Sequence, residues 1–145
     1  MTTDTAKLYK TMVEVAADAI VVTDASGVIE FWNHGAERIF GFPQDEAVGQ
    51  SLDIIIPAGI RARHWEGFNR VMETGKSRYG EGELLAVPGM RKDGSRISIE
   101  FTIVPFHDEQ GRMAGMGAIL RDVTTRFEEV RDLKRRLAAA GGPAG

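Results

Sequence analysis

The chain contains no cysteine among its 145 residues. It therefore cannot form a disulfide framework, a thiolate zinc site, a covalently attached c-type haem or a cysteinyl flavin adduct. Any ligand must bind non-covalently or through histidine, carboxylate or methionine side chains.

Long apolar runs and a strong charge of one sign are also missing. The longest apolar stretches, such as 19–23 and 53–57, fall far short of the ~20 residues of a membrane span, and no basic segment precedes a cleavable hydrophobic one. The formal net charge of −3 provides no basic surface for nucleic acid or an anionic membrane. We therefore expect a soluble, cytoplasmic protein that binds neither nucleic acid nor membrane.

The residues that are present suit one folded domain, because 43% of them are hydrophobic and the length is that of a single core. Their pattern predicts an amphipathic helix, two strands, a cluster of short helices, one longer helix, three strands and a final amphipathic helix. An Asp-Gly pair in KDGS and a glycine in DEQG indicate tight turns, so the last three strands form an antiparallel meander. The expected ranges are 8–17, 19–24, 28–33, 34–41, 43–49, 51–57, 58–74, 81–91, 96–106, 112–121 and 121–137.

One histidine occupies an unusual position on the long helix. At 100° per residue, His64 shares an apolar face with Phe68 and Val71, whereas most polar side chains of this helix fall on its other sides. A titratable imidazole that can bind a metal thus stands where a leucine is usual. A lone histidine on an apolar face is also typical of an ordinary core or rim residue, so this pattern alone leaves both readings open.

Several motifs, in this order and spacing, resemble the PAS family of sensory domains over roughly residues 8–125. The resemblance implies an α+β fold in which short helices and one long helix cover one face of a five-stranded antiparallel sheet, with an amphipathic helix at each end. In different members the pocket holds haem, flavin, a small metabolite or nothing. The motifs are DAIVVTDASGVIEFWNHGAERIFGF (18–42), E-x-x-G-x-S-L (46–52), R-K-D-G-S (91–95) and R-D-V-T (121–124).

This resemblance divides the chain into four parts. We expect an N-terminal amphipathic helix at 1–18, the PAS domain at 19–123, a C-terminal signalling helix of coiled-coil type at 124–140 and a disordered tail at 141–145. An effector domain, such as a histidine kinase, a cyclase or a phosphodiesterase, would lie outside this chain.

The segment IIIPAGIRARHWEGF at 54–68 carries a closer resemblance, to haem-binding PAS domains of the FixL type and of the oxygen-sensing phosphodiesterases. Those domains share an I/M-P followed by R-x-x-H, and the light-sensing flavin type is excluded because it requires a cysteine. The resemblance implies haem b with His64 as the proximal iron ligand. It also places Arg70 and Arg78 where relatives contact the haem propionates, with Phe68 on the same apolar face.

The chain departs from the oxygen-binding pattern at one position. Leu84 or Leu85 stands where those relatives carry an arginine directed at the distal ligand, and without that donor bound oxygen loses a stabilising hydrogen bond. Carbon monoxide and nitric oxide depend less on such a donor. We expect the remaining distal wall to be apolar, formed by Phe101 and Ile103 with Ile119 or Leu120.

Three classes of function follow. The first is a haem-based gas or redox sensor in a two-component type of signalling protein. The second is a PAS domain that binds another small apolar ligand or none and acts mainly in dimerisation. The third, an enzyme, is not expected because no nucleophile–base pair, paired acids or metal cluster is found in the sequence. In either sensor reading, the seam of Phe127, Val130 and Leu137 predicts a homodimer through the terminal helices.

Overall fold

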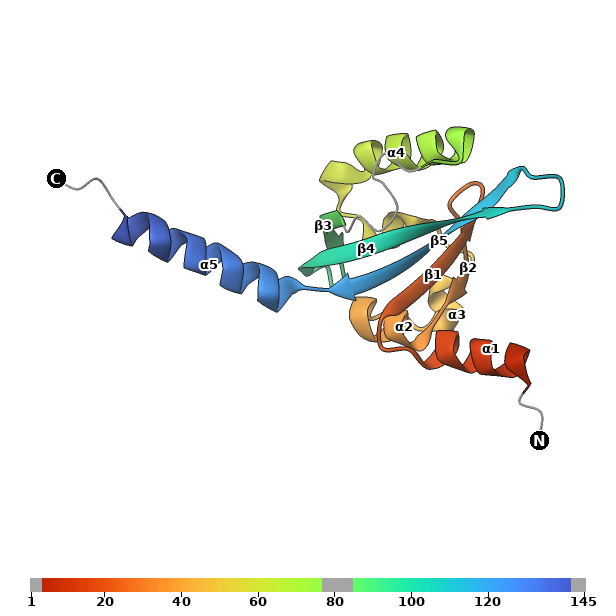
Figure 1. Ribbon diagram of the computed structural model, residues 1–145, viewed down its shortest axis with the longest axis horizontal. Helices are drawn as coiled ribbons and strands as arrows, with labels where there is room; N and C mark the ends of the chain where they lie inside the picture. The colour runs from red at the N-terminus through yellow and green to blue at the C-terminus, as the bar shows by residue number, and fades with distance from the viewer. Residues whose placement is uncertain (1–3, 77–84, 142–145) are drawn as a thin grey trace.

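The computed structural model describes residues 4–76 and 85–141, which form one five-stranded sheet and the helices around it (Figure 1). The strand order is β2-β1-β5-β4-β3, and each neighbouring pair is antiparallel. The expected α+β architecture with a five-stranded antiparallel sheet is confirmed. The strands are β1 (Ala19–Asp24), β2 (Ile29–Trp32), β3 (Leu85–Met90), β4 (Arg96–His107) and β5 (Met113–Asp122).

The helices follow the expected order, with small differences at their ends. The long helix is preceded by a separate 3₁₀ turn, and the first helix begins before residue 8 because the Asp4 side chain accepts a hydrogen bond from the Lys7 amide at 3.2 Å. None of the described helices is long and apolar enough to cross a membrane. They are α1 (Thr5–Val15), α2 (His34–Phe40), α3 (Gln44–Ala47), η1 (Leu52–Ile55), η2 (Ala58–Ile60), α4 (Arg61–Thr74) and α5 (Thr124–Ala140).

A buried asparagine joins the first helix to the sheet and to α2. The Asn33 side-chain oxygen accepts hydrogen bonds from the Ile20 amide at 2.8 Å and the Ala36 amide at 2.9 Å. Its amide group donates to the carbonyl oxygens of Val13, at 2.7 Å, and Asp18, at 3.1 Å. Asn33 is 3% exposed, so four backbone groups are satisfied by one side chain away from water.

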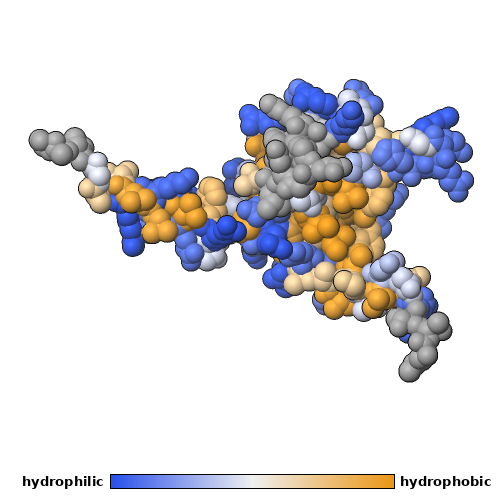
Figure 2. All heavy atoms as spheres, viewed as in Figure 1, coloured by the Kyte–Doolittle hydropathy of each residue, from blue (hydrophilic) through white to orange (hydrophobic). Residues whose placement is uncertain are grey.

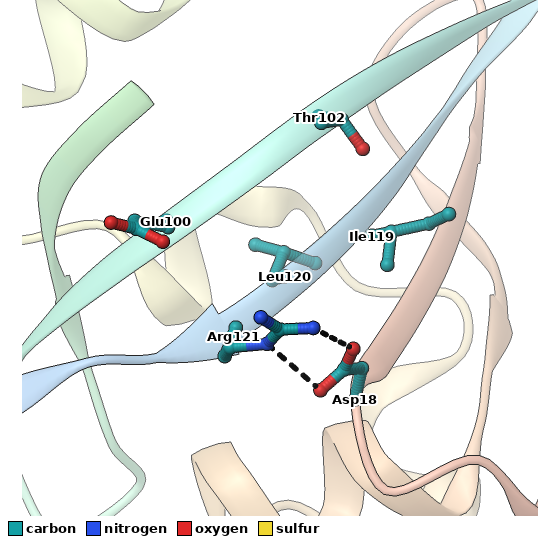
Figure 3. A pocket seen from close by; sticks show the side chains of 6 residues that line it. All are labelled: Asp18, Glu100, Thr102, Ile119, Leu120 and Arg121. Atoms are coloured by element: carbon teal, nitrogen blue, oxygen red, sulfur yellow. Dashed lines mark hydrogen bonds and ion pairs between the residues drawn. The ribbon is translucent and has the colours of Figure 1, made fainter. Parts of the chain in front are cut away.

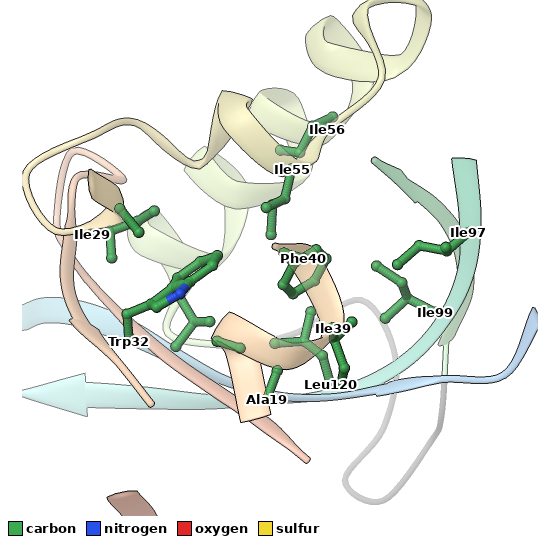
Figure 4. Packing of buried hydrophobic residues seen from close by; sticks show 13 residues of the cluster. Ala19, Ile29, Trp32, Ile39, Phe40, Ile55, Ile56, Ile97, Ile99 and Leu120 are labelled. Atoms are coloured by element: carbon green, nitrogen blue, oxygen red, sulfur yellow. The ribbon is translucent and has the colours of Figure 1, made fainter. Parts of the chain in front are cut away.

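The main core lies between the sheet and the short helices (Figure 4). Trp32 and Phe40 are its largest fully buried side chains, with ring centroids 5.6 Å apart. The indole nitrogen of Trp32 donates to the Phe42 carbonyl at 2.9 Å, so this large ring is buried without an unpaired polar atom. Ile99 from β4 and Leu120 from β5 complete the core from the sheet.

Strands β4 and β5 place alternate side chains on opposite faces of the sheet, as the strand period of two requires. Leu120 is buried on the inner face, which the helices cover, whereas the neighbouring Ile119 is 42% exposed on the outer face. The outer face also exposes Val104 and Phe106. Figure 2 shows hydrophobic atoms over the sheet and along α1 and α5. Neither of these two helices has a buried residue.

Three parts of the predicted organisation lie outside the described residues. They are residues 1–3 of the predicted N-terminal helix, the start of the predicted strand at 81–91 as far as residue 84, and residues 142–145 of the expected C-terminal tail. Helix α5 itself runs over Thr124–Ala140 and leaves the sheet at the end of β5 (Figure 1).

Candidate ligand site beneath helix α4

The first half of α4 is attached to the segment that precedes it. The Arg61 guanidinium donates to the carbonyl oxygens of Ile56, at 2.9 Å, and Asp53, at 3.2 Å. The Trp65 indole nitrogen donates to the Asp53 carboxylate at 2.7 Å. Arg61 therefore caps carbonyl groups at the end of η1, although its side chain remains partly exposed.

The Trp65 ring also rests on the turn between β1 and β2. Gly27 has a φ of 85°, and a Cβ atom at this position would lie 2.3 Å from the Trp65 ring. Only glycine combines the left-handed backbone with the space that the ring occupies. Sequence reasoning missed this contact because 38 residues separate the pair; the glycine was visible only as a turn signal.

His64 directly precedes Trp65 on α4 and lies beside two aromatic rings. Its ring centroid is 4.7 Å from that of Trp65 and 6.2 Å from that of Phe68. The Nδ1 atom is buried and has no hydrogen-bond partner among the described residues. Burial lowers the pKa of His64 below its ordinary value, and the charge of Asp53 opposes this effect only in part. The imidazole is therefore held in its neutral form, the form that binds metal ions.

Side chains fill the space between α4 and the sheet. Phe68 and Val71 from α4 pack against Met116 from β5, and all three are at most 7% exposed. Met116 thus fills core space, a common role of its flexible side chain. A planar ligand at His64 would require α4 to move away from the sheet or these side chains to rearrange.

The predicted apolar wall is divided between the two faces of the sheet. Phe101 and Leu120 are directly opposite each other in the β4–β5 register, and Ile103 packs with the Phe68 cluster, so all three belong to the inner face. Ile119 does not line the space under α4, because strand alternation directs it to the outer face.

The remaining predicted contacts are less informative. Arg70 is exposed on α4, and its guanidinium lies 3.4 Å from the Glu66 carboxylate one helical turn earlier. Leu85 begins β3, where it is paired with Phe101. Arg78 and Leu84 lie outside the described residues.

A shallow hollow of about 150 Å³ lies on the outer face of the sheet (Figure 3). Its main polar feature is an ion pair in which the Arg121 guanidinium is 3.0 Å from the Asp18 carboxylate. Asp18 directly precedes β1 and Arg121 is near the end of β5. The pair therefore links the residue before the first strand to the end of the last strand. Both side chains are more than a third exposed, and such a pair contributes little stability.

The exit from β5 into α5 is held more firmly. The Asp122 carboxylate accepts from the Thr124 amide at 2.9 Å and lies 3.1 Å from the Arg91 guanidinium, which projects from the end of β3. Burial alone raises the pKa of Asp122, but hydrogen bonds from Thr124 and the charge of Arg91 outweigh it and hold that pKa below its usual value. The start of α5 is therefore coupled to the β3–β4 connection.

Comparison with known proteins agrees with this architecture. The sensor protein FixL of Bradyrhizobium diazoefficiens is 31% identical over 121 residues, which cover 79% of this chain and 22% of FixL. The oxygen sensor protein DosP of Escherichia coli is 27% identical over 119 residues, covering 82% of this chain and 14% of DosP. Further relatives are named as histidine kinases. The chain thus spans a minor part of the length of these curated relatives.

A solved structure and a family model give the same result over most of the chain. The crystal structure of a PAS domain from Colwellia psychrerythraea superimposes with a TM-score of 0.74 at 29% identity, covering 84% of this chain and 99% of that domain. The family model for the PAS fold matches residues 13–128, from the end of α1 into the first turn of α5. The chain therefore belongs to the PAS family of sensory domains.

Proposed function

We propose that this PAS domain is a haem-based sensor module in which His64 is the iron ligand. The observation that carries the proposal is the buried, unpartnered Nδ1 atom of a neutral imidazole on the helix face that packs over the sheet. Buried polar side-chain atoms are rarely left without a partner, and an unpaired one calls for a functional explanation. The names of FixL and DosP as sensor proteins support the same class of function.

The residues around His64 suit an apolar, planar group once α4 has moved. Phe68 lies beside the His64 ring, and Ile103 from the sheet packs with the Phe68 cluster. Phe101 and Leu120 lie on the same inner face of the sheet but pack in the neighbouring main core, from which they would extend an apolar wall. When bound, haem would supply an iron centre that takes up a diatomic gas or changes its oxidation state. Because Leu84 or Leu85 stands where oxygen-binding relatives carry an arginine, we propose carbon monoxide, nitric oxide or redox state as the signal in preference to oxygen.

The signal would leave through β5 and α5. A displacement of α4 or of Leu120 reaches Asp122 along one strand, and Asp122 holds the start of α5. We propose that α5 pairs with its equivalent in a homodimer and passes this displacement to an effector domain such as a histidine kinase, a cyclase or a phosphodiesterase. The histidine kinases among the relatives favour the first of these.

A second candidate function is a PAS interaction module that binds another small apolar ligand or none. The filled space between α4 and the sheet favours it, as do the exposed apolar rows on α1 and α5. Both candidates share the output helix and differ only at His64.

Haem titration of the purified chain separates the two candidates. The haem proposal expects a saturable Soret band with the parent protein, and loss of that band with His64→Ala while the circular dichroism of the fold remains. His107→Ala is the matched control, because His107 is exposed at the end of β4. An unchanged Soret band in the His64 variant, or no band in the parent, would contradict His64 as a haem ligand.

A further inference from the structure

A second hollow, of about 220 Å³, lies where α5 leaves the sheet. It is larger than the hollow beside Asp18, and helix and strand residues form it together. Cavities of about 150 Å³ can hold a benzene ring, so an aromatic side chain can occupy a hollow of this size. Its lining residues are Ala86, Glu100, Val123, Arg126, Phe127 and Val130.

The apolar side of this hollow continues along α5. Phe127 and Val130 line the hollow and are 47% and 43% exposed, and Leu137 follows in the same row at 72%. The spacing from Val123 through these residues is four, three and seven, the spacing of a two-stranded coiled-coil seam. The seam therefore begins at the hollow and runs outward along the helix.

The polar residues of the hollow carry opposite charges. Arg126 lies on α5 and Glu100 on β4, and neither forms an ion pair within residues 4–76 and 85–141. In a dimer with a two-fold axis beside α5, the same patch of each copy would meet its equivalent. Arg126 of each copy could then lie opposite Glu100 of the other, which gives two such contacts. Arg126 and Glu100 would then match in charge across the axis.

We propose that this hollow is a dimer socket, and that a second copy of the chain fills it with its own Phe127 ring. In a parallel pair, residues of the same number lie at the same height, so the ring of the second copy reaches the hollow formed at Val123 and Val130. The inference rests on the α5 homodimer of the proposed function and adds the place where the helix pair is fixed to the sheet. A displacement of β4 or β5 would then act directly on the partner copy.

Cross-linking tests the contact, because the parent chain has no cysteine. Glu100→Cys and Arg126→Cys proteins are prepared separately, mixed and oxidised mildly. A covalent heterodimer of the two variants is expected, since a disulfide between them can form only across the interface. Glu100→Cys mixed with Arg112→Cys is the control, because Arg112 lies in the distant β4–β5 turn, and this mixture should give no comparable product.

Equilibrium dimerisation provides an independent measurement. Glu100→Arg and Arg126→Glu should each raise the dimer dissociation constant at least about fivefold, because each reversal creates two repulsive contacts, and the double reversal should restore it. Ala86→Trp places a ring in the hollow from the exposed side of β3 and should weaken the dimer likewise. Arg112→Glu makes the same change of charge away from the hollow and should leave the constant unchanged.

The outcomes separate this inference from the proposal on which it rests. A parent that stays monomeric at every concentration would overturn both the homodimer and the socket. A dimeric parent that gives no cross-linked heterodimer and tolerates the Glu100, Arg126 and Ala86 changes would overturn the socket alone. Haem titration of the same variants keeps the iron-ligand proposal apart, because none of these residues touches His64.

Discussion

His64 shows how burial changes the chemistry of one side chain. In the unfolded chain its imidazole takes up a proton near pH 6.5, whereas in the folded protein burial disfavours the charged form and lowers the pKa. At pH values near and below 6.5, the unfolded state therefore binds more protons at His64 than the folded state does. The contribution of His64 to stability is greatest above that pH and declines as the solution is acidified.

We therefore predict that His64→Leu makes the protein less sensitive to mild acid. Between about pH 7.5 and about pH 5.5, the urea midpoint of the parent should fall relative to that of the variant, because the variant has no buried imidazole to protonate. The exposed histidines and all carboxylates are common to both proteins and cancel in the comparison. A constant difference between the two midpoints across this range would show that His64 is not buried in its neutral form.

Replacing Asn33 should lower the free energy of unfolding strongly, because its small side chain holds several buried backbone groups. Asn33→Asp keeps the oxygen that accepts from Ile20 and Ala36 but brings a carboxylate oxygen against the carbonyls of Val13 and Asp18. We predict a loss of about 2 kcal/mol or more in the free energy of unfolding, since a buried donor is replaced by a charged acceptor.

Urea unfolding measures this loss, and His34→Asp serves as the control one residue further on. His34 is exposed at the first position of α2, where the helix N-terminus favours a negative charge but Glu37 one turn along repels it, so the control should change stability only slightly. Equal destabilisation by both changes would mean that charge near α2, and not the hydrogen bonds of Asn33, decides the effect.

At the scale of elements, α4 is attached at its N-terminal half and packed by apolar contacts further along. Trp65 and Arg61 hold the first turns to Asp53 and to the β1–β2 turn, while Phe68 and Val71 pack against Met116. Any ligand that enters beside His64 must displace the apolar part while the attached part acts as the pivot.

A double-mutant cycle on Gly27 and Trp65 tests this attachment. Gly27→Ala should cost about 2–4 kcal/mol, because the new Cβ collides with the Trp65 ring and the backbone is left-handed. In a Trp65→Ala background the collision is absent, so the same change should cost only about 1 kcal/mol of backbone strain. Equal costs in the two backgrounds, measured by urea unfolding, would show that Trp65 does not rest on the turn.

At the scale of the whole molecule, the apolar surfaces that no described element covers lie at the periphery. Leu8, Met12 and Val15 on α1, Phe127 and its seam on α5, and the outer face of the sheet all remain exposed (Figure 2). Solvent-exposed helices without a buried face depend on tertiary or quaternary packing for their stability. We therefore propose both terminal helices as surfaces for assembly.

The α5 seam is the surface we predict to hold two copies together. Replacing Phe127 and Val130 together by glutamate puts like charges opposite each other in the pair and should produce monomers. Light scattering measures the mass, and unchanged circular dichroism of the sheet shows that the domain is intact.

Glu128→Lys with Glu129→Lys is the matched control for that double variant, since it changes the charge of the exposed helix outside the seam. A Phe127/Val130 variant that remains as dimeric as the parent would place the contact elsewhere, most directly on the α1 row of Leu8, Met12 and Val15.

Local sequence patterns were enough to predict the element order, because hydrophobic periodicity and the Asp-Gly turn each act over a few residues. The single five-stranded sheet and the family followed from the resemblance of the ordered motifs to PAS domains. The helical period also placed His64 on the apolar face of α4. The iron-ligand role of His64 stays a prediction.

Which side chains meet became clear only from the folded arrangement of the chain. Strand alternation and register separated Leu120 from Ile119, and no local pattern could choose between adjacent residues without knowing which face the helices cover. The Trp65 ring on Gly27, the four contacts of Asn33 and the hollow at the foot of α5 all join segments distant in the chain. Such contacts depend on how the sheet brings those segments together, and a single sequence carries no direct record of that arrangement.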